Sequence, residues 1–294
     1  MSTYHTPVLL QEVLDFLRVE RGGLYIDATL GGGGHTQQIL QRGGRVLGLD
    51  VDQDAIEHVL KNFGTGNEIK IVKGNFKDID TIALKEGFEK VNGILFDLGV
   101  SSHQFEEGER GFSFQKDAVL DMRMDRDLQV RALDLLNGLT KKELYELFIT
   151  YGEEHRALAI SESIVRSRLV KPIETTGELV KIINKAVGQS NKGINNATKV
   201  FQALRIAVND ELHVIEEALP KALELLGDKG RLIVISFHSL EDRIVKNKFK
   251  EFEAKDMGII ITKKPVSPTI AELESNRRAR SAKLRVFEKQ SKRV

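Results

Sequence analysis

The first hundred residues alternate between short apolar stretches and stretches with helical periodicity. Apolar runs predict strands at residues 24–28, 46–50, 69–73 and 93–97. Helical patterns lie between the first of these runs, at residues 36–42 and 53–63. Strands that alternate with helices through short connections are typical of a parallel α/β sheet.

Further strands are predicted in the last quarter of the chain. An apolar run at residues 231–237 is followed by two more at residues 258–263 and 282–288. In the last run Leu284 and Val286 alternate with charged neighbours, as in an antiparallel strand pair at a sheet edge. We therefore expect an α/β, Rossmann-like fold with a mostly parallel seven-stranded sheet and an antiparallel late strand.

Helical signals replace this rhythm between the fourth and fifth predicted strands. Capping boxes, each a threonine followed three residues later by a glutamate, begin helices at Thr140 and Thr175. Residues 156–168 also have helical periodicity. Residues 196–219 predict one long helix with an apolar stripe and Pro220 at its end.

A helical segment of this length between two strands is an insertion into the sheet. It follows the carboxyl end of a strand, which is the edge where open α/β sheets bind ligands. We expect a discontinuous sheet domain at residues 1–107 and 208–294. The insertion, residues 108–207, is expected to recognise the substrate.

A glycine-rich turn follows the first predicted strand. Four consecutive glycines, Gly31 to Gly34, let a ligand lie against main-chain N–H groups at a helix N-terminus, because glycine has no Cβ. The second strand ends in Asp50, about 20 residues past the first glycine, where nucleotide-binding folds hold ribose hydroxyls. These features predict a nucleoside-containing cofactor.

The residues around the glycines discriminate between cofactors. A dinucleotide fingerprint needs glycine where this chain has Thr36, and the chain has no Gly-Lys-Ser/Thr sequence for a phosphate-binding loop. Asp27 and the spacing of the glycines resemble the motif of S-adenosylmethionine methyltransferases, with Thr29 at the usual first glycine. An acid there suits a methionine ammonium group and would repel a pyrophosphate. A glycine turn without a ligand is the alternative.

Polar or aromatic residues follow the later strands. Phe76 is placed either to stack on an adenine ring or to join the core. Asp97, a glycine turn, Ser101 and Ser102 predict a polar pocket for a small planar substrate; the alternative is a capped Asx turn. After the fifth strand, Ser239 either belongs to a second polar turn of the site or only caps the next helix.

Composition restricts the partners and the compartment. The net charge is +1, with 44 basic and 43 acidic residues, so the overall balance indicates no partner. Cysteine is absent, which excludes disulfides, thiolate catalysis and cysteine-based zinc sites. No apolar run approaches the ~20 residues that span a membrane, and the N-terminus lacks a secretory pattern. We expect a cytoplasmic protein with no membrane partner.

Several motifs in a fixed order resemble the ribosomal RNA small subunit methyltransferase H family, also called MraW. Between His5 and Val286 they occupy residues 27–36, 96–102, 110–114, 120–125, 151–154, 201–206 and 235–243. Val119 and Arg277 stand where the family usually has proline, which leaves the local turn geometry open.

The resemblance implies a class I methyltransferase fold with a helical insertion. It also implies a bacterial enzyme that methylates N4 of cytidine 1402 in 16S rRNA, a nucleotide near the decoding centre. The substrate is either naked rRNA or the assembled small ribosomal subunit. S-adenosylmethionine is the implied methyl donor, and no metal is expected. The family's cofactor positions fall on Gly33, Gly34, His35, Asp50, Phe76, Asp97 and Gln104.

Catalytic and RNA-binding candidates follow from the chemistry. The cytosine amine is a poor nucleophile because its lone pair is delocalised into the ring, so the protein must align it and accept its hydrogen bonds. The catalytic candidates are Asp97, Ser101 and Ser102. A near-neutral enzyme that acts on a polyanion needs local positive charge, which an acid-free stretch at residues 181–205 and a basic C-terminal segment supply. The RNA-binding candidates are Lys185, Lys192, Lys199, Arg278 and Arg280.

Two other function classes fit the residues less well. A nicotinamide-dependent oxidoreductase would need a glycine where this chain has Thr36. Heat denaturation in the presence of each cofactor would separate this class from a methyltransferase, because the true cofactor protects the protein. A non-catalytic RNA-binding or assembly protein on this scaffold would be expected to lose the glycine loop or Asp50, and both are present. The sequence carries no indication of oligomeric state.

Overall fold

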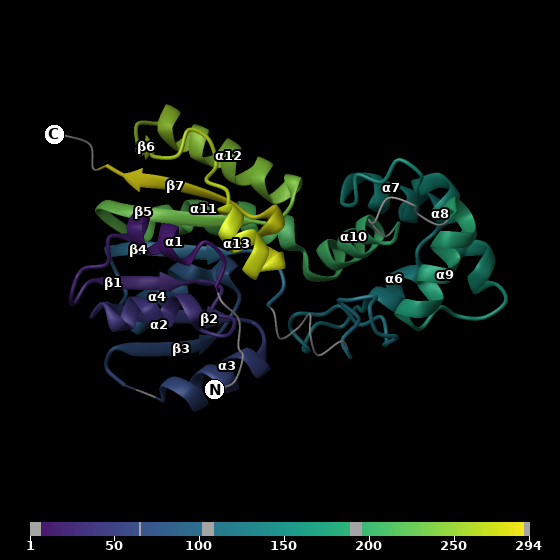
Figure 1. The fold of residues 1–294 in the computed structure, drawn as a ribbon, viewed down its shortest axis with the longest axis horizontal. Coiled ribbons are helices and arrows are strands. Elements are labelled where there is room, and N and C mark those ends of the chain that lie inside the picture. Colours follow the sequence, from purple (N-terminus) through teal and green to yellow (C-terminus); the bar gives the residue numbers. More distant parts are fainter. Residues whose placement is uncertain (1–6, 65, 102–108, 189–195, 291–294) are drawn as a thin grey trace. The chain divides into compact units, whose positions relative to one another are not determined.

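The structure, a computed structural model, describes residues 7–64, 66–101, 109–188 and 196–290. The chain divides into two compact units, one of residues 1–102 and 212–294 and one of residues 103–211 (Figure 1). The bounds expected for the insertion, 108 and 207, lie inside the second unit. Over the described residues, no helix combines the length and apolar character needed to cross a membrane.

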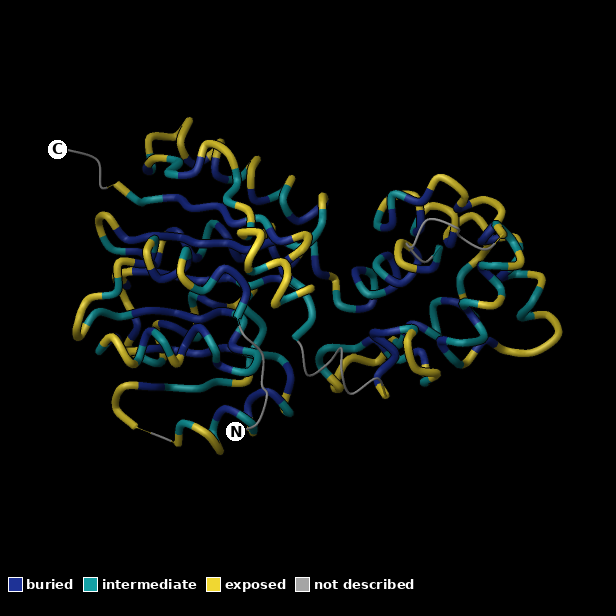
Figure 2. The backbone as a smooth tube through the Cα atoms, in the orientation of Figure 1, coloured by how far each residue is buried: buried dark blue, intermediate teal, exposed yellow. Residues whose placement is uncertain are grey.

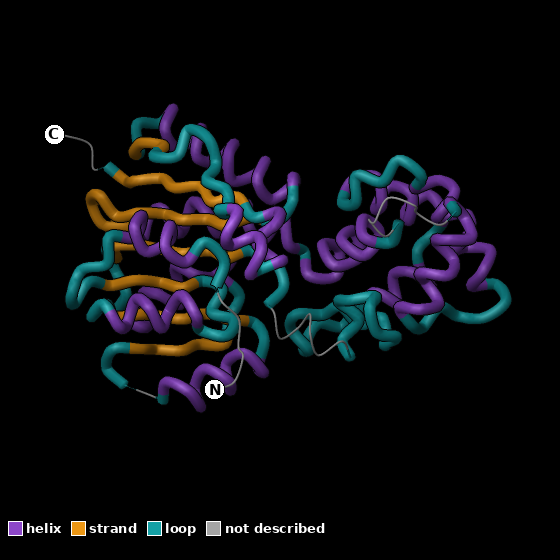
Figure 3. The backbone as a smooth tube through the Cα atoms, in the orientation of Figure 1, coloured by secondary structure: helices purple, strands orange, loops and turns teal. Residues whose placement is uncertain are grey.

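The first unit contains a seven-stranded sheet (Figure 3). Its strands are β1 (Leu24–Asp27), β2 (Arg45–Asp50), β3 (Ile69–Lys73), β4 (Val91–Asp97), β5 (Leu226–Ser236), β6 (Gly258–Ile260) and β7 (Lys283–Lys289). The order is β3-β2-β1-β4-β5-β7-β6, in which β1 to β5 pair in parallel and β7 is antiparallel to both its neighbours. The expected Rossmann-like methyltransferase sheet with an antiparallel late strand is confirmed.

Apolar side chains alternate between two cores, one on each face of the sheet. Figure 2 shows that the strands are largely buried. Ile26 and Val234 face a core formed with α4 (Ile79–Glu86), α11 (Glu211–Leu225) and α12 (Ser239–Ala254). Tyr25 and Ile233, one residue earlier in each strand, face a second core formed with α1 (Leu10–Leu17) and α2 (Gly34–Gln41). Helix α3 (Gln53–Phe63) packs through a smaller apolar cluster with β3. Helices on both faces leave the strand ends as the accessible edges of the sheet.

The strand order reverses at β1. Strands β2 and β3 extend to one side of it, and β4 pairs with its other side. Asp27, Asp50 and Asp97 are the last residues of β1, β2 and β4, so parallel pairing brings them to the same edge. Ligands bind at this type of switch point in doubly wound sheets.

The second unit is helical. It contains α6 (Ala132–Gly138), α7 (Lys141–Thr150), α8 (Ala157–Arg168), α9 (Thr176–Val187) and α10 (Thr198–Asn209). Both predicted capping boxes are confirmed, at Thr140 and Thr175. The Asn209 side chain donates to the Met122 carbonyl and accepts from the Met124 N–H, so it ties the segment before α6 to α10.

The single long helix expected over residues 196–219 is wrong. Helix α10 ends at Asn209 and α11 begins at Glu211, because Asp210 takes a left-handed conformation with φ +51°. Arg205 and Glu211 form a two-fold hydrogen-bonded ion pair across the break, at 2.8 and 2.9 Å.

Pro220 was expected to end a helix and instead lies inside α11. A proline there leaves the carbonyl four residues earlier without its helical partner. That residue is Glu216, which is exposed, so water can satisfy the carbonyl. The cost of the proline is therefore lower than at a buried position.

Candidate functional site

Asp27 organises the end of β1. Its buried carboxylate accepts hydrogen bonds from Thr36 Oγ1 at 2.7 Å and from the Thr29 N–H at 3.4 Å. Burial nevertheless raises its pKa to about 6. Thr36, the residue that breaks the dinucleotide pattern, therefore ties α2 to the end of β1.

The glycine loop is shaped for close backbone approach. Gly33 precedes α2 with φ +76°, and a Cβ there would lie 2.9 Å from Phe63 Cε2. A Cβ on Gly34, the first residue of α2, would lie 2.6 Å from Pro7 Cγ. Both positions therefore favour glycine, and the first N–H groups of α2 have no helical acceptors and can face a ligand.

Asp50 lies opposite this loop at the end of β2. Oδ2 accepts from the Gly31 N–H at 2.8 Å and Oδ1 from the Asp52 N–H at 2.9 Å. Burial raises its pKa to about 6 in spite of these bonds. Each carboxylate oxygen accepts more than one hydrogen bond, so Asp50 can also take two hydroxyl donors.

His35 is buried and neutral. Nε2 lies 3.1 Å from the Val8 carbonyl oxygen, which only accepts, so Nε2 carries the hydrogen. Burial lowers its pKa to about 4. Nδ1 therefore presents a lone pair to Asp97 Oδ2, 3.8 Å away, and does not donate to it.

Asp97 is the most electrostatically perturbed group at this edge. Its N–H donates to Thr29 Oγ1 at 2.6 Å, while its side chain is 25% exposed. Oδ1 is buried and has no hydrogen-bond partner among the described residues. Burial, followed by the negative charge of Asp27, raises its pKa to about 8. Such an atom is ready to accept from a ligand N–H or to face a ligand cation.

The other cofactor and catalytic candidates follow the strand ends. Phe76 begins η1 (Phe76–Asp78) and is half-buried, with its ring edge-on to Phe96 at a centroid distance of 5.4 Å. Ser101 is half-buried after the Gly99 turn, where φ is +91°. Ser102 and Gln104 lie outside the described residues.

The RNA-binding candidates have different environments. Lys185 is exposed on α9, and Lys199 is exposed on α10 with Nζ donating to the Glu153 carbonyl at 2.6 Å. Arg280 is exposed, whereas Arg278 is half-buried and donates from Nη2 to the Val100 carbonyl at 3.2 Å. Lys192 lies outside the described residues.

Sequence reasoning did not assign the Thr29 hydroxyl to the site. This hydroxyl accepts the Asp97 N–H and thereby links β1 to β4 at the switch point. The available signal was a threonine at a motif position usually occupied by glycine. A threonine at that position brings a hydroxyl that needs a hydrogen-bond partner, and here the partner is the Asp97 N–H at the end of β4.

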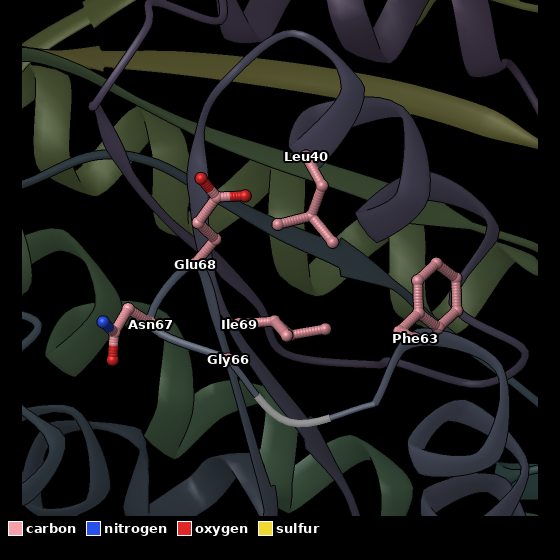
Figure 4. Close-up of a pocket in the computed structure, with 6 residues that line it drawn as sticks. All are labelled: Leu40, Phe63, Gly66, Asn67, Glu68 and Ile69. Atoms are coloured by element: carbon pink, nitrogen blue, oxygen red, sulfur yellow. The ribbon is translucent and has the colours of Figure 1, made fainter.

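A separate pocket of about 380 Å³ lies near the start of β3 (Figure 4). Its lining residues are Leu40, Phe63, Gly66, Asn67, Glu68 and Ile69. None of the predicted site residues lines it, and its one ionisable group, Glu68, is exposed. The carboxylate-lined edge at the switch point is therefore the better candidate site.

Comparison with known families decides the assignment. The model of the MraW methylase family matches residues 2–290. The chain belongs to the MraW methylase family. Since the match covers both compact units, the helical unit is part of the MraW pattern.

Full-length relatives agree with the MraW assignment. The ribosomal RNA small subunit methyltransferase H of Fusobacterium nucleatum is 46% identical, over 98% of this chain and 98% of its own. The protein of the same name from Carboxydothermus hydrogenoformans is 46% identical, over 99% of each. A solved rRNA methylase from Streptococcus thermophilus aligns over 98% of this chain and 99% of its own. Its sequence identity is 13% and its TM-score is 0.47, so this likeness adds no support to the assignment.

Proposed function

We propose that this chain is an S-adenosylmethionine-dependent methyltransferase that modifies the N4 amine of cytidine 1402 in 16S rRNA. The observation that carries the proposal is the buried Oδ1 of Asp97, which has no hydrogen-bond partner within the described residues and lies at the switch point of a methyltransferase sheet. The names of the full-length relatives support small-subunit rRNA as the substrate.

The residues at this edge fit S-adenosylmethionine. Asp50 holds the ribose hydroxyls, the Gly33–Gly34 turn approaches the methionine end, and Phe76 contacts the adenine. Asp27 and the carboxylate form of Asp97 supply the negative charge that suits an ammonium and a sulfonium, and a bound cation in turn favours that form of Asp97. When bound, the cofactor supplies a methyl group on a positively charged sulfur, so the transfer itself requires no metal.

Asp97 also prepares the nucleophile. In its carboxylate form Oδ1 accepts a hydrogen bond from the cytosine amine, which returns lone-pair density to the nitrogen that forms the new bond. The Thr29 hydroxyl holds the Asp97 backbone in place, so little reorganisation is needed at the moment of transfer. The target cytosine has to leave its stack to reach this edge.

Cofactor affinity is expected to fall with decreasing pH. Asp27 and Asp50 have pKa values raised to about 6, so both lose their negative charge as the pH drops through that region. A cation and hydroxyl donors bind the carboxylate forms better. Calorimetry from pH 5 to pH 8 should show tighter binding as the pH rises, with a smaller change in Asp50→Asn. A flat profile in the wild-type protein would contradict these roles.

The exposed lysines of the helical unit are proposed to contact RNA phosphates. Each phosphate contact to single-stranded RNA contributes ~0.7 to the slope of log affinity against log salt. Lys185→Gln should therefore lower that slope by about 0.7 and leave cofactor affinity unchanged. Lys142→Gln, which changes an exposed lysine on α7, is the matched control. An equal slope for both variants would assign Lys185 to the solvated surface.

Methyl transfer in a purified system tests the proposal. The protein is incubated with methyl-labelled S-adenosylmethionine and either naked 16S rRNA or isolated small subunits, and the RNA is then digested to nucleosides. Label should appear in N4-methylcytidine with at least one substrate. Label in another nucleoside would contradict the N4 assignment, and protection from heat by a nicotinamide cofactor alone would favour the oxidoreductase class.

A further inference from the structure

Arg278 reaches the proposed transfer site from a segment near the end of the chain. It belongs to η2 (Arg277–Ser281), and its Nη2 donates to the Val100 carbonyl at 3.2 Å. Val100 follows Gly99, whose φ of +91° marks a tight turn directly after β4. The guanidinium therefore holds the turn that connects Asp97 to Ser101.

The segment that presents Arg278 is firmly anchored. Asn276 Oδ1 accepts the Arg278 N–H at 3.2 Å, and Ala279 is fully buried in the core shared with α1. In the preceding helix α13 (Ile270–Ser275), Glu272 Oε1 accepts the Leu9 N–H at 2.7 Å. Arg280, only two residues further along η2, is exposed. The two arginines thus have different surroundings in one short segment.

Ionisable groups from four elements surround Asp97, and three of them carry a charge. Asp27 on β1 and Glu241 on α12 raise its pKa, whereas the positive charge of Arg278 lowers it. His35 on α2 is neutral and presents only a lone pair. Removing the guanidinium would therefore leave Asp97 among two acids and a neutral ring, and its carboxylate form would become less populated.

We propose that Arg278 is a positioning residue for methyl transfer: its hydrogen bond to Val100 fixes the turn after β4, and its positive charge favours the carboxylate form of Asp97. The proposal rests on the function proposed above. It differs from the phosphate contact expected from the sequence, because a phosphate contact would act on RNA affinity, whereas a positioning role acts on turnover and on the charge of Asp97.

Three variants separate these roles. Arg278→Gln should lower kcat about tenfold or more, as expected for the loss of a charged hydrogen bond, with little change in KM for RNA. Its pH–rate profile should move to higher pH. Arg278→Lys keeps the positive charge but loses the planar guanidinium. Its pH–rate profile should therefore stay near that of the wild type, while its kcat should lie between those of the wild type and Arg278→Gln. Arg42→Gln, which changes an exposed arginine at the C-terminal end of α2, is the matched control and should behave as the wild type.

A readout without RNA keeps this test independent of the proposed function. Carbon-13 NMR of labelled aspartate carboxyls, with the Asp97 signal assigned through Asp97→Asn, should show Asp97 titrating at higher pH in Arg278→Gln than in the wild type. An unchanged titration would overturn the proposal, even if the wild type methylates rRNA. A variant altered only in KM for RNA and in salt dependence would likewise overturn it and make Arg278 a phosphate contact.

Discussion

Asp97→Asn is expected to reduce methyl transfer about 10²–10³-fold at saturating cofactor. The substitution keeps the size of the side chain but removes its negative charge. It also replaces one acceptor oxygen by an NH₂ group, near the Asp27 carboxylate and the lone pair of His35 Nδ1. A lost transition-state contact of this kind costs ~2.7–4 kcal/mol. Single-turnover methylation of 16S rRNA measures the effect. A wild-type rate would mean that the reacting amine does not contact Asp97.

The same variant should be more stable than the wild type at pH 8, which provides a control against misfolding. The pKa of Asp97 is raised from its ordinary value of 3.8 to about 8, so the folded state holds more protons than the unfolded state between these values. Stability therefore falls as the pH rises through this window, and asparagine removes that loss. Melting curves should show a higher Tm for Asp97→Asn at pH 8 and similar values near pH 4. A lower Tm at pH 8 would point to damage to the fold.

Asp50→Ala is expected to weaken S-adenosylmethionine binding at least about tenfold. Hydrogen bonds to a charged group are worth ~1.5–3 kcal/mol each, and the proposed ribose contact uses two. The variant also frees the Gly31 N–H, so the glycine loop loses one anchor. Calorimetry measures the affinity, with Asp15→Ala on the exposed side of α1 as a charge-matched control. Unchanged affinity in a folded Asp50→Ala variant would remove Asp50 from the cofactor site.

The sheet could be predicted from the sequence because its signal is local. Each buried strand alternates between two apolar cores, as Tyr25 and Ile26 do, and this alternation is visible in one stretch of chain. The ends of β1, β2 and β4 carry the acids that mark the switch point. Parallel pairing then brings Asp27, Asp50 and Asp97 to one edge without further information.

Features that depend on distant contacts could not be predicted in this way. The end of α10, directly before the break at Asp210, is held by Asn209 bonds to residues more than eighty positions earlier. The Arg278 bond to Val100 joins residues 178 positions apart. In both cases the partner that gives the residue its role lies elsewhere in the chain, so neither a local helical stripe nor a basic run reveals it.

The most direct test of the proposed function is to map the modification of 16S rRNA in cells that contain or lack this protein. Mass spectrometry of the fragment that contains cytidine 1402 should show the N4 methyl group when the protein is present. It should show loss of that methyl group when the gene is deleted, and again when Asp97→Asn replaces the wild type. An unchanged methylation pattern at this nucleotide in the deletion strain would contradict the proposed function.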